Sequence, residues 1–220
     1  MARPSQKDLV RAVLSRYPCT YAEELHLRSA DTPSGLFGLL VMALLMSARI
    51  KADVAVDAAR ALSKKRWTTA KAMAGASWED RTRVLNRAGY ARYDESTSRM
   101  LGDTADLALD RYRGDLRRLR DEAGRDPAAE RRLLRQFKGV GDVGVDIFFR
   151  EVQRSWDEVY PIGDDRALRA AERLGLPPNP VALSKLTSRD DLSRLVTGLV
   201  RTDLDKAWDE ISSASPSGTA

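Results

Sequence analysis

The chain has 220 residues, of which 43% are hydrophobic and 31% are charged, with a formal net charge of +5. This composition excludes a disordered tail and a membrane protein, and the longest apolar run, from Leu36 to Met46, is too short to span a bilayer. A single cysteine, Cys19, excludes an internal disulfide and a four-cysteine zinc or iron–sulfur site within this sequence. Since His26 is the only histidine, any chemistry here depends on carboxylates, hydroxyls, lysines or backbone dipoles.

The positive charge comes mainly from arginine, with 29 Arg and 8 Lys against 32 acidic residues. A guanidinium group binds two phosphate oxygens at once, which favours a nucleic-acid partner, although a GC-rich genome also enriches arginine. The basic runs Lys64–Arg66 and Arg117–Arg120 are expected to be solvated helix faces. No secretion signal is recognised at the start, so we expect a cytoplasmic protein, nucleoid-associated if it is bacterial.

Apolar residues recur at helical spacing along most of the chain, and few segments alternate as strands do. The pattern predicts an all-α protein of about ten helices. The expected helices span 6–17, 33–47, 53–62, 78–88, 94–111, 127–137, 142–154, 165–174, 188–200 and 202–211. Residues 212–220 are small and polar and are predicted to form a flexible tail.

The most specific local feature is a two-glycine segment, Lys138-Gly139-Val140-Gly141, between two predicted helices. Two glycines around one apolar residue allow a tight reversal in which Val140 fills the corner between the helices. Such a turn leaves backbone amides exposed at the start of the second helix, where the helix dipole favours a phosphate oxygen. The contact needs no side chain and is therefore independent of DNA sequence. An ordinary helix–helix turn with a glycine cap is the alternative interpretation.

This hairpin resembles that of the helix-hairpin-helix DNA glycosylases of the endonuclease III superfamily, whose motif reads Leu-Pro-Gly-Val-Gly. The family places its catalytic aspartate before a later helix, in a pattern similar to Ile162–Leu176 here. Asp164 lies nine residues before Arg173 and matches that aspartate, with Asp165 as the second choice. The resemblance therefore implies that Asp164 is the catalytic residue.

Two upstream segments extend the resemblance. Leu44–Arg49 looks like the family's Leu-Leu-Ser-Ala-Gln segment, which places Arg49 where the family fills the gap left by a flipped base. Gly89–Tyr93 is similar to a second loop that wedges into DNA, with Tyr90 and Arg92 as contacts. The implied DNA-binding residues are Arg49, Tyr90, Arg92, Lys138, Gly139, Val140, Gly141 and Val143.

The resemblance also implies a two-lobed helical DNA glycosylase fold. Residues 34–141 would form a six-helix barrel domain that ends in the hairpin, and residues 1–33 with 142–211 a second lobe that carries Asp164. Double-stranded DNA containing a lesion or mismatch would lie between the lobes. We expect a monomer with no membrane partner and no cofactor, lacking the family's iron–sulfur cluster.

The implied reaction is the hydrolysis of the N-glycosidic bond of a damaged or mismatched base, as in base-excision repair. Breaking this bond develops positive charge on the sugar, which a fixed carboxylate stabilises, and the same carboxylate can orient or deprotonate water. The base must first leave the stack. Family members that also cut the strand carry a lysine where this sequence has Val143, so a monofunctional glycosylase without lyase activity is predicted.

Several residues depart from the family pattern and leave alternatives open. Asp142 stands where a basic residue is frequent, and Gly163 replaces the usual valine before the acid. Asp164 could also be an ordinary N-cap, because aspartate before a helix is common. A non-catalytic helix-hairpin-helix DNA-binding protein is therefore the main alternative, and a protein-binding helical scaffold is a third.

Overall fold

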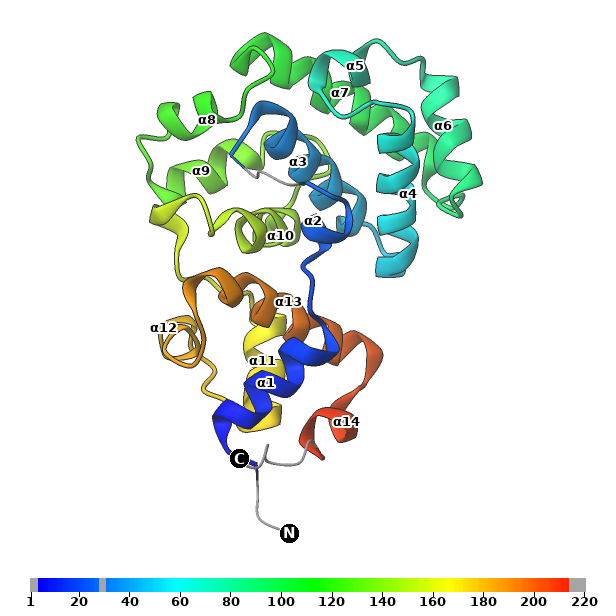
Figure 1. The fold of residues 1–220 in the computed structure, drawn as a ribbon. Helices are drawn as coiled ribbons and strands as arrows, with labels where there is room; N and C mark the ends of the chain where they lie inside the picture. The colour runs from blue at the N-terminus through cyan, green and yellow to red at the C-terminus, as the bar shows by residue number, and fades with distance from the viewer. Residues whose placement is uncertain (1–3, 28–30, 214–220) are drawn as a thin grey trace. The chain divides into compact units, whose positions relative to one another are not determined.

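A computed structural model describes residues 4–27 and 31–213, and within these ranges it contains helices and no strand (Figure 1). The predicted all-α class is confirmed. By its contacts the chain divides into a larger unit, Ala22–Glu158, and a smaller unit built from Met1–Tyr21 and Val159–Ala220. This division differs from the expected one at residue 141, because the helix after the hairpin packs on a helix of the larger unit. No helix in the described ranges is both long and apolar enough to cross a membrane.

The larger unit is organised around α3, a helix that is apolar on every side. Thr32 starts this helix by accepting a hydrogen bond from the Gly35 amide at 3.1 Å, and Pro33 occupies the first turn. α10 and α4 pack along α3. The helices of this unit are α2 (Tyr21–Glu24, beginning at the last residue of the smaller unit), α3 (Pro33–Ser47), α4 (Ala52–Lys64), α5 (Ala70–Ala74), α6 (Trp78–Arg87), α7 (Asp94–Tyr112), α8 (Arg117–Glu122), α9 (Pro127–Leu134) and α10 (Asp142–Val152), followed by the 3-10 turn η1 (Asp157–Val159).

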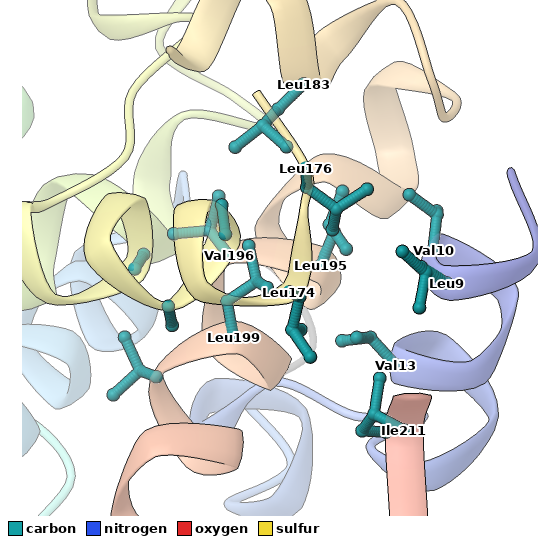
Figure 2. Close-up of a cluster of buried hydrophobic side chains, with 14 of the residues drawn as sticks. Leu9, Val10, Val13, Leu174, Leu176, Leu183, Leu195, Val196, Leu199 and Ile211 are labelled. Atoms are coloured by element: carbon teal, nitrogen blue, oxygen red, sulfur yellow. The ribbon is translucent and has the colours of Figure 1, made fainter. Parts of the chain in front are cut away.

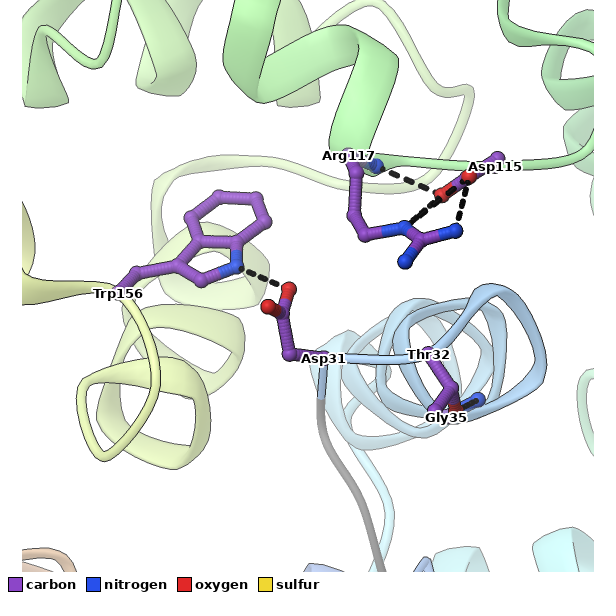
Figure 3. Close-up of polar contacts among 6 residues, drawn as sticks. All are labelled: Asp31, Thr32, Gly35, Asp115, Arg117 and Trp156. Atoms are coloured by element: carbon purple, nitrogen blue, oxygen red, sulfur yellow. Dashed lines mark hydrogen bonds and ion pairs between the residues drawn. The ribbon is translucent and has the colours of Figure 1, made fainter.

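The segment that follows α10 is tied to the start of α3. The Trp156 indole Nε1 donates a hydrogen bond to Asp31 Oδ1 at 3.2 Å, just before the cap formed by Thr32 (Figure 3). Trp156 is fully buried, and its ring packs edge-on against Phe148 of α10 with the ring centroids 5.7 Å apart. Residues far apart in the sequence are therefore fixed to the same end of α3.

A buried cluster of charged groups joins α8, α9 and η1. Arg120 donates two hydrogen bonds to the Glu158 carboxylate, at 2.5 and 2.6 Å, and its guanidinium lies over the Trp156 ring. The prediction that Arg120 lies on a solvated helix face is wrong, because its side chain is only 12% exposed. Glu130 of α9 is completely buried, and this burial, together with the neighbouring Glu158, raises the pKa of Glu130. Burial is the largest influence and acts to raise the pKa of Glu158 as well. The hydrogen bonds from Arg120, from the backbone and from Glu130, together with the Arg120 charge, outweigh burial and lower that pKa.

The smaller unit packs its helices around one apolar cluster. Its helices are α1 (Gln6–Arg16), α11 (Asp165–Leu174), α12 (Pro180–Ser184), α13 (Arg189–Asp205) and α14 (Trp208–Ser212). Side chains from all five helices meet in this cluster (Figure 2). α1 approaches α13 closely at Gly198, where a Cβ atom would lie 2.6 Å from Val13 Cγ1. Gly198 therefore permits the contact between these two helices.

Most predicted helices lie within a few residues of their expected ends, but the predicted break at residue 201 is wrong. α13 runs without interruption through Thr202, whose buried hydroxyl donates to the Gly198 carbonyl at 2.8 Å. The helix ends at Lys206, which has the left-handed φ of 55°. The short helices α2, α5 and α12 were missed, and α8 was expected only as a helix face at Arg117–Arg120, since four to six residues carry too little periodicity to detect. Of the expected flexible tail, residues 214–220 lie outside the described residues, and Ser212 is the last residue of α14.

Candidate nucleic-acid interface

The two-glycine segment forms a tight hairpin between α9 and α10. Gly139 has a φ of +88°, a conformation that residues with a side chain rarely adopt. Phe137 and Val140 are buried, while Lys138, Gly139 and Gly141 are exposed. Val140 therefore fills the corner as predicted, and the backbone around it faces solvent.

The two glycines of this turn have different roles. A Cβ atom on Gly139 would lie 2.6 Å from Met100 Sδ and 3.6 Å from Leu44 Cγ, so this glycine allows the turn to lie close to α7 and α3. A Cβ atom on Gly141 would have no heavy atom within 4 Å. Gly139 is thus required by the packing of the turn, and Gly141 borders open space.

The start of α10 leaves backbone amides without acceptors. The Val140 amide is used inside the turn, where it donates to the Phe137 carbonyl at 2.9 Å, and the Val145 amide makes the first helical bond, to Gly141. Between them, the exposed residues Gly141, Asp142 and Val143 and the buried Gly144 have amides without an acceptor in the described part of the chain, and Gly141 provides no side-chain cap. These amides and the positive end of the helix dipole form a site suited to an anion. The predicted DNA contact at Val140 is corrected, because both its side chain and its amide are occupied by the turn.

Two further predicted segments meet the hairpin at the C-terminal end of α3. A Cβ atom on Gly144, in the first turn of α10, would lie 2.8 Å from the Ser47 hydroxyl oxygen, so the helices touch just before Arg49. The Tyr90 hydroxyl donates to the Leu45 carbonyl at 2.8 Å, which attaches the 89–93 loop to the same end of α3. The structure therefore brings together three segments that are far apart in the sequence and that were each predicted to contact DNA.

Within these segments the predicted contact residues divide into two groups. Arg49 and Arg92 are exposed, and the Arg92 guanidinium lies 5.3 Å from the centre of the Tyr93 ring. Tyr90 is fully buried, and its burial raises the pKa of its hydroxyl to about 12. The prediction that Tyr90 contacts DNA is therefore wrong, because the residue anchors the loop from inside the core.

Most of the basic residues beside the hairpin form ion pairs with acidic side chains of the same chain. Lys138 Nζ lies 3.3 Å from Asp103 Oδ2, although both side chains are at least half exposed and such surface pairs contribute little to stability. Arg135 Nη1 lies 3.4 Å from Asp142 Oδ1, and Arg131 lies 2.6 Å from Asp146 and 3.8 Å from Asp142. Much of the expected positive charge is therefore compensated within the chain.

The sequence held a signal for these pairs. Arg135 lies three residues before Lys138 and Asp142 three residues after Gly139, while Arg131 and Asp146 each lie seven residues from the same two positions. Residues four apart lie on one face of a helix, so Arg131 and Arg135 share a face, and so do Asp142 and Asp146. The ion pairs could therefore have been predicted once the hairpin was assigned.

Asp164, the predicted catalytic acid, lies in the smaller unit as the N-cap of α11. Its Oδ1 accepts a hydrogen bond from the Ala167 amide at 3.0 Å, and the residue is half-buried. Asp165 is the first residue of α11 and is exposed, and Arg166 Nε lies 3.5 Å from Asp203 Oδ2. The N-cap interpretation of Asp164 is confirmed, and its catalytic role stays a prediction.

The described residues offer no cluster of three or more histidine, cysteine, aspartate or glutamate side chains that could hold a metal ion. Cys19, the only cysteine in the sequence, is half-buried. A cavity of about 330 Å³ opens on α6 and the start of α7. None of the predicted site residues lines it; its lining residues are Trp78, Glu79, Thr82, Arg83, Asn86, Arg87 and Asp94.

Comparisons with known proteins bear on the fold. No protein-family model matches this sequence, and no curated protein matches it either. Among solved structures, the chain is similar to a trapped endonuclease III–DNA covalent intermediate in an estranged-adenine complex, with a TM-score of 0.50 and 16% identity over 88% of this chain and 82% of that one. It is also similar to a non-covalent endonuclease III–DNA complex, with a TM-score of 0.51 and 16% identity over 88% and 81%. The chain therefore has an all-helical, endonuclease III-like fold.

Proposed function

We propose that this protein is a DNA glycosylase that hydrolyses the N-glycosidic bond of a damaged or mismatched base in double-stranded DNA. The observation that carries the proposal is the exposed two-glycine turn, whose amides at Gly141, Asp142 and Val143 have no acceptor in the described chain. In an endonuclease III-like fold, this turn is suited to hold one DNA phosphate without reading sequence. The exposed Arg49 and Arg92, on segments fixed to the same end of α3, are further candidate DNA contacts.

Asp164 is the proposed catalytic acid of this reaction. Cleavage of the glycosidic bond develops positive charge on the deoxyribose, and a carboxylate held in a fixed position stabilises that charge. The hydrogen bond from the Ala167 amide to Oδ1 holds the carboxylate in a fixed position. The carboxylate can then orient the attacking water or accept its proton.

The proposed reaction is hydrolysis without a covalent intermediate on lysine. Val143 stands at the position where the resemblance places a lysine in strand-cutting members, and its side chain is 62% exposed. An alkyl side chain cannot form a Schiff base with the sugar. We therefore expect abasic sites with the DNA strand left intact.

The test is an excision assay on duplexes that carry uracil, an alkylated base, an oxidised base or a mismatch. Each duplex is incubated with the protein and then divided, and one half is heated in alkali, which cuts the strand at abasic sites. The proposal expects cleavage of at least one substrate only after alkali. Strand cutting without alkali would contradict the prediction that the protein lacks lyase activity. DNA that stays intact on every substrate, even after alkali, would contradict the proposal that the protein is a glycosylase.

Asp164→Asn and Asp165→Asn form a matched pair, because the two residues are adjacent and each change removes one charge. Asparagine is as good an N-cap as aspartate, so Asp164→Asn should leave the fold intact. We expect it to lower the excision rate by roughly 100-fold or more, as for the loss of a group that stabilises transition-state charge, while DNA affinity stays similar or rises. Asp165→Asn should excise normally, and the reverse pattern would transfer the catalytic role to Asp165.

One observation favours a second candidate, a helix-hairpin-helix protein that binds DNA without catalysis. Asp164 is the N-cap of α11, where its Oδ1 accepts the Ala167 amide at 3.0 Å, and this capping role accounts for the residue without catalysis. This candidate also predicts DNA binding that weakens steeply with salt. It differs from the glycosylase in leaving no abasic site on any substrate.

A further inference from the structure

The charges beside the hairpin are arranged as if an anion were already present. Arg135 caps the end of α9, and its Nη1 lies 3.4 Å from the Asp142 carboxylate at the first position of α10. Arg131, one turn earlier, lies 3.8 Å from the same carboxylate and 2.6 Å from Asp146. Asp142 is thus the common partner of the two arginines that flank the turn.

Asp142 also stands directly at the open amides. It lies between Gly141 and Val143, whose amides have no acceptor in the described residues, and its side chain is 63% exposed. Negative charge in the first turn of a helix is favourable for the same reason that a phosphate is, since both compensate the helix dipole. The Asp142 carboxylate therefore supplies part of the negative charge that a DNA phosphate would bring to the start of α10.

We propose that Asp142 is an internal competitor that limits the affinity of the hairpin for DNA phosphate. This inference rests on the proposed function, because it concerns the same phosphate site. When a phosphate binds at the amides, Arg135 and Arg131 exchange the Asp142 carboxylate for phosphate oxygens, and Asp142 stays beside the phosphate as a repelling charge. Asp142 then lowers the affinity for damaged and ordinary duplexes alike, because both present the same phosphate backbone to the hairpin.

The expected change in DNA affinity follows from the repulsion between the Asp142 carboxylate and a bound phosphate, two charges a few ångströms apart near the surface. Removing the charge in Asp142→Asn should tighten binding to duplex DNA by about 3- to 10-fold. Freeing the arginines should also let the protein neutralise up to one more phosphate. The plot of log affinity against log salt concentration should therefore become steeper by up to about 0.9.

The experiment measures fluorescence anisotropy with a labelled duplex that carries a stable abasic analogue and with an undamaged duplex, over a series of NaCl concentrations. Asp57→Asn is the matched control: Asp57 is 60% exposed, lies on α4 and pairs with Arg60 at 3.1 Å, so the change removes the same charge from a similar helical ion pair. Asp142→Asn should tighten binding and steepen the salt dependence to the same extent for both duplexes, because the hairpin contacts the same phosphate backbone in each. Asp57→Asn should bind as the unmodified protein does.

A double-mutant cycle with Arg135→Gln tests the exchange of partners. If Arg135 is shared between Asp142 and the phosphate, Arg135→Gln should cost more affinity in the Asp142→Asn background than in the unmodified chain. Equal costs in both backgrounds would overturn the exchange.

The possible outcomes separate this inference from the proposed function. Duplex binding by the unmodified protein with no gain in Asp142→Asn overturns the inference and leaves DNA binding intact. Absence of binding in both proteins overturns both proposals. A gain that Asp57→Asn reproduces also overturns the inference, because it would then reflect net charge alone.

Discussion

The helices α10 and α11 begin in opposite ways, although the resemblance assigns a functional role to each start. α10 begins after Gly141, which provides no side-chain cap and leaves the first amides open. α11 begins after Asp164, whose own carboxylate accepts the Ala167 amide at 3.0 Å. The first start can therefore receive an anion from outside, while the second fixes an anion that belongs to the chain. A phosphate site and a catalytic carboxylate need these two opposite arrangements.

The largest expected effect on stability tests whether the shape of the turn depends on Gly139. Gly139→Ala places a side chain at a φ of +88° and a Cβ atom 2.6 Å from Met100 Sδ. We expect the free energy of unfolding to fall by about 2–4 kcal/mol, from backbone strain and overpacking together. Thermal denaturation followed by circular dichroism measures the change. A variant as stable as the unmodified protein would show that the turn does not require glycine there.

The second prediction concerns what holds α9, the helix that leads into the turn. Because the pKa of the buried Glu130 is raised, the folded chain binds a proton that the unfolded chain loses at the ordinary glutamate pKa. Stability should therefore fall as the pH rises above about 4.5, by at most about 1.4 kcal/mol per pH unit, until Glu130 also ionises in the folded state. Glu130→Gln should abolish this part of the pH dependence and be the more stable protein near pH 8.

Urea denaturation of both proteins between pH 5 and pH 9 makes this comparison, with the difference taken at each pH. A constant difference across the range would contradict the prediction. The contribution of Glu158 to stability changes with pH in the opposite direction. Because its pKa is lowered, its contribution is complete above the ordinary glutamate pKa and is lost as the pH falls toward the lowered value.

The third prediction separates the capping role of Asp164 from its charge. Asp164→Ala removes the hydrogen bond to the Ala167 amide and should lower the free energy of unfolding by about 1 kcal/mol. Asp164→Asn keeps a side-chain acceptor and should change stability little. Parallel denaturation curves measure both variants. If the two lose the same stability, the charge and not the cap stabilises the start of α11.

The smallest effect on stability is expected when α10 is given a side-chain N-cap like that of α11. Gly141→Asn should raise the free energy of unfolding by only a few tenths of a kcal/mol, since its side chain can accept the open amides. The same bond should weaken duplex binding, because the asparagine oxygen competes with phosphate for these amides. Anisotropy and denaturation on the same samples test both parts. Unchanged DNA affinity would place the phosphate contact elsewhere.

The sequence was sufficient for features that depend on neighbouring residues. Helix starts at Thr32, Ser77 and Asp126 follow from side chains that accept amides two or three positions later, and the structure contains all three caps. The hairpin was also predictable, because a left-handed φ and a close approach both require glycine at Gly139. The predicted break at residue 201 is the exception: no glycine or proline stands there, and α13 continues through it.

The predictions that failed at individual residues depend on packing. Tyr90 was predicted at the DNA surface from its place in a loop, but it fills a space against α3 that no local pattern reveals. Arg120 was predicted to be solvated from the charges around it, but Glu158 and Trp156, more than thirty residues later, bury it. An aromatic or a long basic side chain can serve either environment, and its neighbours in space decide which.

The sequence by itself determined that this protein is helical, that it turns sharply at Gly139 and that Asp164 precedes a helix, because each of these depends on a few consecutive residues. Only the tertiary structure decided that the Arg49 segment, the 89–93 loop and the hairpin meet at one end of α3. It also decided that Asp142 shares the arginines beside the turn. The physical reason is that helical periodicity and capping act over one turn, whereas burial and ion pairing depend on side chains that only the folded chain brings together.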